Sequence, residues 1–160
     1  MMGKKKKLNI KISDYISEKM ICLDLQNTTK EGAIKELAEL LKDAKEVVAF
    51  DTFLENVFAL EKLCPTAIGN ETAIPHARTD AVNNIIIAFG RSVGGVNFYA
   101  PDNKPAKLIF LMGTPKKDIE KYLQILAHLV GLLKKEAFCQ RLLDAKNKLE
   151  ILNAIREIED

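Results

Sequence analysis

The sequence of 160 residues contains no tryptophan, only three cysteines and only two histidines. Cys22, Cys64 and Cys139 are odd in number and far apart, and no CxxC spacing occurs, so the sequence predicts neither a disulfide framework nor a zinc site. His76 and His128 lie in unrelated segments without clustered carboxylates, so the spacing of metal ligands is missing too. We therefore expect a protein without a metal centre, in a reducing cytoplasm.

The sequence also lacks a long apolar run and an excess of one charge. No segment approaches the roughly 18 apolar residues of a membrane helix, and the lysine-rich start precedes no signal-peptide core. With 24 basic and 22 acidic side chains the formal net charge is +2, which makes no case for nucleic-acid binding. The glycine-rich patterns GxGxxG and GxxxxGK[ST] are absent as well. We expect a cytoplasmic protein that uses no cofactor, binds no nucleic acid and does not insert into a membrane.

Hydrophobic residues make up 48% of the chain, which is enough for one sizeable core but too little for two ordinary domains. We expect a flexible basic tail over residues 1–8 and one compact domain over residues 9–160. The lysines at positions 4–7 favour a solvated tail, and contact with phosphates or an anionic membrane is the alternative.

Apolar residues recur at helical spacing in several parts of the chain. The segments that show this pattern are 29–42, 51–65, 119–133 with a continuation through 143, and 149–158. Thr28 or Thr29 is the expected N-cap of the first helix, and Asp51 is the expected cap of the second. The sequence therefore predicts amphipathic helices before and after its central part.

Short apolar runs predict the strands, at residues 20–25, 85–89 and 108–112. Turns are predicted at Gly94-Gly95 and over residues 100–105, and residues 65–75 are predicted to be irregular and rich in turns. Because strands and helices alternate, we predict an α/β fold with a single mixed β-sheet flanked by helices on both faces.

The residues around His76 favour chemistry at its ring. His76 follows Pro75 in the segment Ala73-Ile74-Pro75-His76-Ala77-Arg78-Thr79, and the proline stiffens the backbone that presents it. A neutral imidazole is nucleophilic at about pH 7 and forms a phosphoramidate that passes its phosphate on readily. We predict that His76 accepts a phosphoryl group. From the residues alone, a structural histidine remains an alternative, as does a thiol enzyme that uses Cys64.

Phosphoryl transfer also needs positive charge or hydrogen-bond donors around the phosphate oxygens. Arg78, the hydroxyls of Thr66 and Thr79, and backbone N–H groups around Gly69 and Asn70 are the candidates near His76 in sequence. We predict that these residues position the phosphoryl group.

The segments Thr66-Ala67-Ile68-Gly69-Asn70 and Ala73-Ile74-Pro75-His76 resemble the motif of the fructose/mannitol-type enzyme IIA domains of the bacterial phosphotransferase system. The resemblance extends over nearly the whole chain after residue 8, and the opening stretch is most similar to the nitrogen-regulatory IIA branch. It implies a central mixed sheet flanked by helices. It also implies that His76, through Nε, takes phosphate from the histidine-containing phosphocarrier protein and gives it to a IIB domain, or serves as a regulatory signal.

Three positions depart from the pattern of that family. Leu60 replaces an arginine that lies near the phosphohistidine, and Glu71 replaces a glycine. Tyr122 replaces a second active-site histidine but can still donate a hydrogen bond, whereas His128 is expected to be a packing or surface residue. The missing arginine leaves a second hypothesis open, namely a regulatory binding module that keeps the IIA fold and acts without phosphate.

Overall fold

The computed structural model describes residues 9–160, so the predicted tail over residues 1–8 lies outside the described part. Its strands are β1 (Ile21–Cys22), β2 (Ala67–Gly69), β3 (Thr72–Ala73), β4 (His76–Arg78), β5 (Ile86–Val96) and β6 (Ala106–Thr114). Its helices are the 3-10 turns η1 (Ile12–Asp14) and η2 (Glu18–Met20), and α1 (Lys30–Glu39), α2 (Phe50–Leu63), α3 (Ile119–Leu133), α4 (Glu136–Asp144) and α5 (Lys148–Glu159). Within these residues no helix combines the length and apolar character that a membrane crossing requires.

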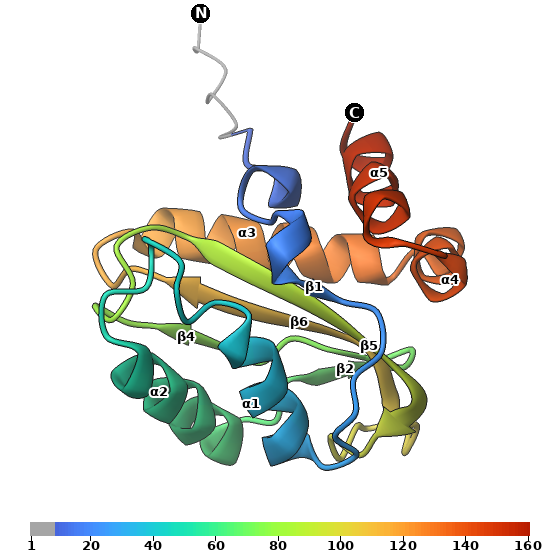
Figure 1. The fold of residues 1–160 in the computed structure, drawn as a ribbon, viewed down its shortest axis with the longest axis horizontal. Helices are drawn as coiled ribbons and strands as arrows, with labels where there is room; N and C mark the ends of the chain where they lie inside the picture. Colours follow the sequence, from blue (N-terminus) through green and yellow to red (C-terminus); the bar gives the residue numbers. More distant parts are fainter. Residues whose placement is uncertain (1–8) are drawn as a thin grey trace, which may run out of the picture.

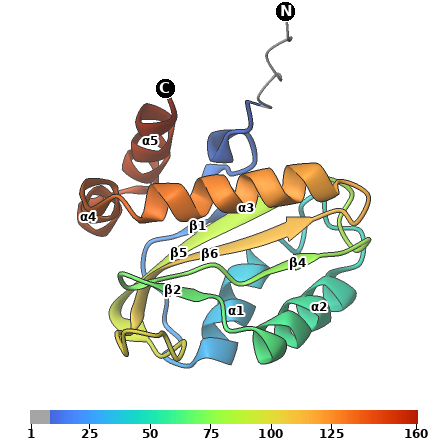
Figure 2. The ribbon, with the colours of Figure 1, turned by 180° about the vertical axis from the view of Figure 1, so that it is seen from behind.

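A mixed sheet lies between two layers of helices (Figures 1 and 2), which confirms the predicted fold class. The strand order is β1-β5-β6-β3-β2, and β4 also pairs with β6. Strands β5 and β6 are antiparallel, whereas β1 runs parallel to β5, and β3 and β4 run parallel to β6. One core lies between the sheet and α3, α4 and α5, and the other lies between the sheet and α1 and α2. Residues 86–90 of β5 and 108–112 of β6 are buried on both faces, and these parts of the strands are continuous apolar runs.

The predicted turn at Gly94-Gly95 is wrong, because β5 continues through both glycines to Val96. Val96 pairs with Ala106, and the register shifts between Arg91 and Val96 as in a β-bulge. Gly95 has a φ of +80°, which a glycine adopts without strain. The glycines therefore bend a paired strand, and the chain reverses later, at the predicted turn over residues 100–105.

The first two helices begin close to their predicted starts. Thr29 caps α1 as predicted, since its hydroxyl accepts a hydrogen bond from the Gly32 N–H at 3.1 Å. The predicted cap of α2 is wrong, because Ala49 is the N-cap and Asp51 lies in the first turn. There the Asp51 carboxylate still favours the helix, since negative charge is stabilised near a helix N-terminus.

Residues 65–75 are more regular than predicted, because they contain the antiparallel hairpin of β2 and β3. Asn70 and Glu71 form its tip with φ of 54° and 61°, the positive values that a two-residue type I′ turn requires. Glycine adopts such a φ more easily than glutamate does, which gives a physical reason for the family's glycine at position 71. The hairpin escapes sequence analysis because its strands are only three and two residues long.

Arg91 joins the sheet to α4. Its Nε donates to the Leu23 carbonyl at 3.1 Å. Its Nη1 lies 3.0, 3.1 and 2.7 Å from the carbonyl oxygens of Leu142, Leu143 and Ala145. The guanidinium thus binds carbonyls at the end of α4 that have no partner within the helix.

We expect Arg91→Met to lower the free energy of unfolding by about 2–4 kcal/mol, because these half-buried carbonyls lose a charged donor. Urea unfolding measures the change. Arg141→Met is the matched control, since the ion pair of Arg141 with Glu157 is exposed and should contribute no more than about 1 kcal/mol. A loss for Arg91→Met that is no larger than the loss for the control would contradict the role of Arg91.

Candidate functional site

His76 is presented by the sheet itself. It begins β4 and pairs with Met112 of β6, while the Pro75 carbonyl accepts a hydrogen bond from Met112 N at 3.0 Å. Alternate residues of a strand point to opposite faces. Ala77 packs in the core under α1 and α2, so His76 and Arg78 lie on the other face, which α3 covers (Figure 2). The tyrosine of α3 that reaches His76 is Tyr122.

Both nitrogens of the His76 ring have a partner. Nδ1 lies 2.7 Å from the Ile74 carbonyl oxygen, and Nε2 lies 3.0 Å from the Tyr122 hydroxyl. The two rings meet edge to face, with centroids 5.8 Å apart and an interplanar angle of 88°. A carbonyl can only accept, so Nδ1 carries the proton of a neutral ring and Nε2 keeps its lone pair. The nucleophilic nitrogen therefore faces Tyr122.

Burial sets the protonation of this pair. It lowers the pKa of His76, while the Ile74 carbonyl and the Glu61 carboxylate act in the opposite direction. Burial also raises the pKa of Tyr122. The positive charge of the Arg78 guanidinium opposes that rise, because it stabilises the deprotonated form of the Tyr122 hydroxyl. Near neutral pH the histidine is therefore a neutral nucleophile beside a neutral hydroxyl donor.

Glu61 holds the segment that leads to His76. Its carboxylate is almost fully buried and accepts the Thr66 hydroxyl, the Thr66 N–H at 2.9 Å and the Lys30 ammonium at 2.8 Å. The Thr66 carbonyl accepts a hydrogen bond from Ile74 N at 3.1 Å. The Thr66 hydroxyl is therefore engaged with Glu61, while the Thr66 carbonyl holds Ile74, whose own carbonyl anchors His76.

The other predicted positioning residues lie elsewhere. Thr79 is buried, and its hydroxyl donates to Asn56 Oδ1 at 2.6 Å and accepts from Ala81 N at 3.0 Å. Gly69 and Asn70 lie at the far end of the hairpin, where Asn70 N donates to Asp102 at 3.2 Å. The structure thus places Arg78 and Tyr122 on the His76 side of the sheet and links Thr66 to His76 through Ile74, but it gives Gly69, Asn70 and Thr79 other partners.

The remaining departures from the family pattern also have defined places. Leu60 is half-buried in α2. The carboxylate of Glu71 pairs with Lys107 at 3.2 Å, so its charge is compensated at the hairpin. His128 Nε2 lies 2.7 Å from Glu159 of α5, which is the packing role expected of it.

Sequence analysis did not identify Glu61 and Lys30 as part of this site. A signal for Glu61 was present, because it follows Phe53 and Val57 at intervals of four residues and so continues the buried face of α2. A carboxylate on a buried face needs partners. No spacing in the sequence pointed to Lys30, because its contact with Glu61 joins two different helices.

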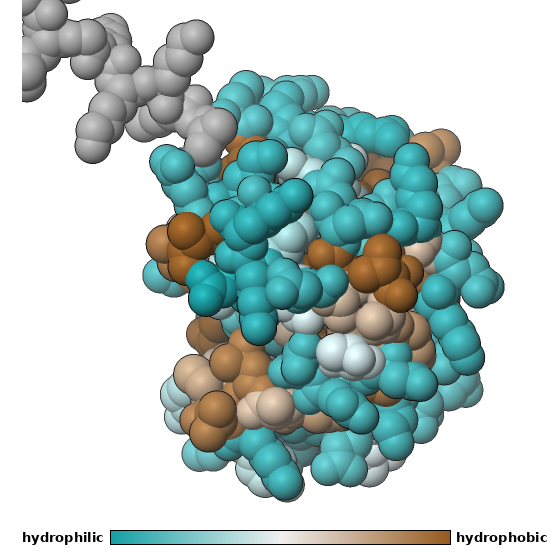
Figure 3. All heavy atoms as spheres, turned by 90° about the vertical axis from the view of Figure 1, so that its left-hand side faces the viewer, coloured by the Kyte–Doolittle hydropathy of each residue, from teal (hydrophilic) through white to brown (hydrophobic). Residues whose placement is uncertain are grey.

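Exposed apolar side chains occur on α2 and α3, the helices that carry Glu61 and Tyr122. Leu63 is 85% exposed at the end of α2, and Ile119 and Leu123 of α3 are 50% and 60% exposed on either side of Tyr122. From the side where α3 begins, Figure 3 shows hydrophobic groups in separate patches among hydrophilic ones. The two helices that contribute Glu61 and Tyr122 therefore also carry apolar surface that a protein partner could cover.

Comparisons with known proteins agree with this architecture. The family model "Phosphoenolpyruvate-dependent sugar phosphotransferase system, EIIA 2" matches residues 14–158. The fructose-specific EIIA component of Haloferax volcanii is 38% identical over 92% of this chain and 96% of its own length.

Two solved structures show the same fold. The crystal structure of nitrogen regulatory protein IIA-Ntr from Neisseria meningitidis aligns with a TM-score of 0.84 and 29% identity, over 90% of this chain and 98% of that one. Enzyme IIA for mannitol from Escherichia coli, solved in complex with phosphorylated enzyme IIB, aligns with a TM-score of 0.77 and 23% identity, over 89% and 97%.

The fold, the motif around His76 and the match of the family model over 14–158 agree. The chain belongs to the enzyme IIA type 2 family of the phosphoenolpyruvate-dependent sugar phosphotransferase system.

Proposed function

We propose that this protein is a phosphoryl carrier that accepts phosphate on Nε2 of His76 from the histidine-containing phosphocarrier protein. It then passes the phosphate to a IIB domain or uses it as a regulatory signal. The observation that carries the proposal is the anchoring of Nδ1 by the Ile74 carbonyl, which leaves the lone pair on Nε2. A nucleophile held in one tautomer needs no proton shift between its two nitrogens before attack.

The transfer is an in-line displacement. The lone pair of His76 Nε2 forms the new N–P bond, while the bond from phosphorus to the donor's ring nitrogen breaks and that nitrogen keeps the electron pair. The proton stays on Nδ1, which continues to donate it to the Ile74 carbonyl. In the unphosphorylated protein the Tyr122 hydroxyl is hydrogen-bonded to Nε2. It moves aside to admit phosphorus and then donates its hydrogen bond to a phosphoryl oxygen.

Arg78 supplies the positive charge in place of the family's arginine at position 60. It lies on the same face of β4 as His76 and acts on the Tyr122 hydroxyl, which contacts Nε2. Its guanidinium is exposed and therefore free to bind phosphoryl oxygens. Leu60 cannot do so.

The partners follow from the family and the surface. A IIB domain is supported by the Escherichia coli complex of enzyme IIA with phosphorylated enzyme IIB, and by the exposed apolar side chains of α2 and α3. Relatives named for fructose and for nitrogen regulation both align along the chain, so transport and regulation are both compatible with this site. In either role the protein works in the cytoplasm.

A second candidate function is a regulatory module that binds its partner without phosphate. Leu60 favours it, because the loss of an arginine near the phosphohistidine removes charge that would stabilise a phosphoryl group. Such a module would keep its affinity for the partner when His76 is replaced, whereas a carrier would lose all downstream transfer.

Incubation with phosphoenolpyruvate and the general phosphotransferase proteins tests the carrier function. We expect intact-mass analysis to show one acid-labile phosphoryl group on the wild type and none on His76→Ala. His128→Ala is the matched control and should be labelled like the wild type, because His128 contacts Glu159 rather than the site. A wild type that stays unlabelled with cognate donor proteins would favour the phosphate-independent module.

Tyr122→Phe isolates the hydroxyl that faces Nε2. We expect it to slow phosphorylation by about 2-fold to 10-fold, the value of one neutral hydrogen bond, without loss of stability. A time course of phosphorylation, quenched at set times, measures the rate. The control is Tyr99→Phe, which also removes one tyrosine hydroxyl. Tyr99 is 73% exposed and lies outside α3, so this change should leave the phosphorylation rate unchanged. Equal rates for both variants would show that Tyr122 does not assist the transfer.

The pH dependence follows from the lowered pKa of His76. Only the neutral ring attacks phosphorus, so the labelling rate should fall as the pH is lowered through this pKa and stay level above it. Because burial dominates, the midpoint should lie below the ordinary value of 6.5. Proton NMR of the His76 ring, assigned with His76→Ala, gives the midpoint independently of the donor. A midpoint at or above 6.5 would contradict the buried, neutral ring.

A further inference from the structure

We propose, on the basis of the function proposed above, that Lys30 and Glu61 form a charge-neutral pair that positions His76. Glu61 holds the backbone that anchors the ring, and Lys30 compensates the negative charge of Glu61. Neither residue touches the phosphoryl group, so both are positioning residues.

Glu61 carries more contacts than a helix end requires. It lies in the last turn of α2 and is 4% exposed, and it accepts from the Thr66 N–H, the Thr66 hydroxyl and the Lys30 ammonium. These contacts fasten the segment after α2 at the residue where the hairpin starts. A buried carboxylate is stable only when its oxygens are bonded and its charge is paired, and here both conditions are met.

A continuous series of hydrogen bonds joins Glu61 to the imidazole ring. Glu61 binds Thr66, the Thr66 carbonyl accepts Ile74 N at 3.1 Å, and the Ile74 carbonyl binds His76 Nδ1 at 2.7 Å. Ile74, whose carbonyl selects the tautomer of His76, is therefore held through its own N–H by Thr66, which Glu61 binds in turn. Displacement of Thr66 would move the Ile74 carbonyl and loosen the ring.

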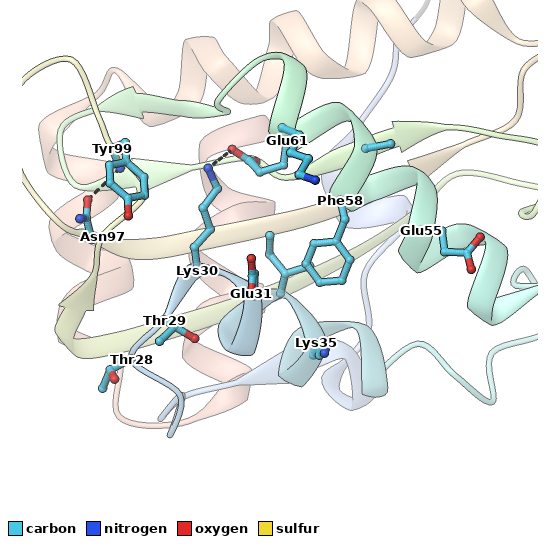
Figure 4. Close-up of a pocket in the computed structure, with 13 residues that line it drawn as sticks. Thr28, Thr29, Lys30, Glu31, Lys35, Glu55, Phe58, Glu61, Asn97 and Tyr99 are labelled. Atoms are coloured by element: carbon cyan, nitrogen blue, oxygen red, sulfur yellow. Dashed lines mark hydrogen bonds and ion pairs between the residues drawn. The ribbon is translucent and has the colours of Figure 1, made fainter.

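Lys30 reaches Glu61 from another helix. It begins α1, and its Nζ lies 2.8 Å from Glu61 Oε2 and 5.6 Å from the ring centroids of Phe98 and Tyr99. Figure 4 shows the pair at one side of a pocket of about 860 Å³ between α1 and α2. The aromatic rings and the carboxylate hold the ammonium in place.

The pairing matters because a phosphoryl group brings negative charge to His76. The Glu61 carboxylate is close enough for its charge to act on the imidazole, and it favours the protonated ring that cannot attack phosphorus. Without Lys30 the full charge of Glu61 would repel the incoming phosphoryl group. With Lys30 the carboxylate keeps its bonds to Thr66, and its field at the ring is reduced.

The alternative is a purely structural pair that ties α1 to α2. A structural pair would affect only the stability of the protein, whereas a positioning pair would also affect the pKa and tautomer of the His76 ring. The charged and titratable groups that act on the ring and on Tyr122 are Glu61, Arg78 and Cys64. A substitution of Lys30 leaves the other two unchanged, so the titration of His76 reports on the pair.

The test uses Lys30→Met, Lys30→Arg and Glu61→Gln in the full chain. NMR follows the pKa and tautomer of His76, and thermal unfolding confirms that each variant is folded. We expect Lys30→Met to raise the pKa of His76, since Glu61 is left uncompensated, and Glu61→Gln to lower it, since glutamine still accepts a hydrogen bond from Thr66 but carries no charge. Lys30→Arg should restore the wild-type value.

Lys35→Met is the matched control, because Lys35 lies in α1 and lines the same pocket but makes no ion pair with Glu61. It should leave the titration of His76 unchanged. With cognate donor proteins, Lys30→Met should be phosphorylated at least about threefold more slowly than Lys35→Met.

Opposite pKa shifts for Lys30→Met and Glu61→Gln, with recovery in Lys30→Arg, would support the positioning pair. Unchanged titration in the folded variants, or shifts in the same direction, would overturn it. If Glu61→Gln does not fold, the comparison of Lys30→Met with Lys30→Arg decides alone. A wild type that is not phosphorylated would refute the carrier function instead. The NMR titration of His76 would still test whether Lys30 and Glu61 position the ring.

Discussion

The hydrogen bond between His76 Nδ1 and the Ile74 carbonyl is the contact on which the site depends. It selects the tautomer and so leaves the lone pair on Nε2, the nitrogen that faces Tyr122 and that we propose as the nucleophile. The bond exists because Ile74 and His76 flank a buried proline where the hairpin meets β6, so the backbone cannot rotate freely. The sheet thus serves as a rigid support for one imidazole ring.

The site has two opposing electrostatic requirements, a neutral histidine ring and positive charge near a bound phosphoryl group. Burial keeps the ring neutral and nucleophilic, yet a phosphoryl group needs positive charge once it arrives. This chain has leucine at position 60, so cations must come from elsewhere in the fold. We propose that Arg78, on the same strand face as His76, supplies that charge, and that Lys30 only compensates the negative charge of Glu61.

Much of the fold was predictable from the sequence, because apolar periodicity is set by burial. The long runs of β5 and β6, the helices and the Thr29 cap follow from local pattern. The turn at Gly94-Gly95 was wrong because glycine marks a bulge as readily as a reversal, and only pairing with β6 distinguishes them. The motif around His76 predicts it as the phosphoryl acceptor, which stays a prediction. The Lys30 contact with Glu61 was not predicted, since it joins helices about thirty residues apart and depends on tertiary packing.

The most direct measurement is nitrogen and phosphorus NMR of the ¹⁵N-histidine-labelled protein after incubation with phosphoenolpyruvate and the general phosphotransferase proteins. The hydrogen bond from Nδ1 to the Ile74 carbonyl predicts a phosphorus atom bonded to Nε2 of His76, with Nδ1 still protonated. Phosphorus on Nδ1, or on any residue other than His76, would contradict the account.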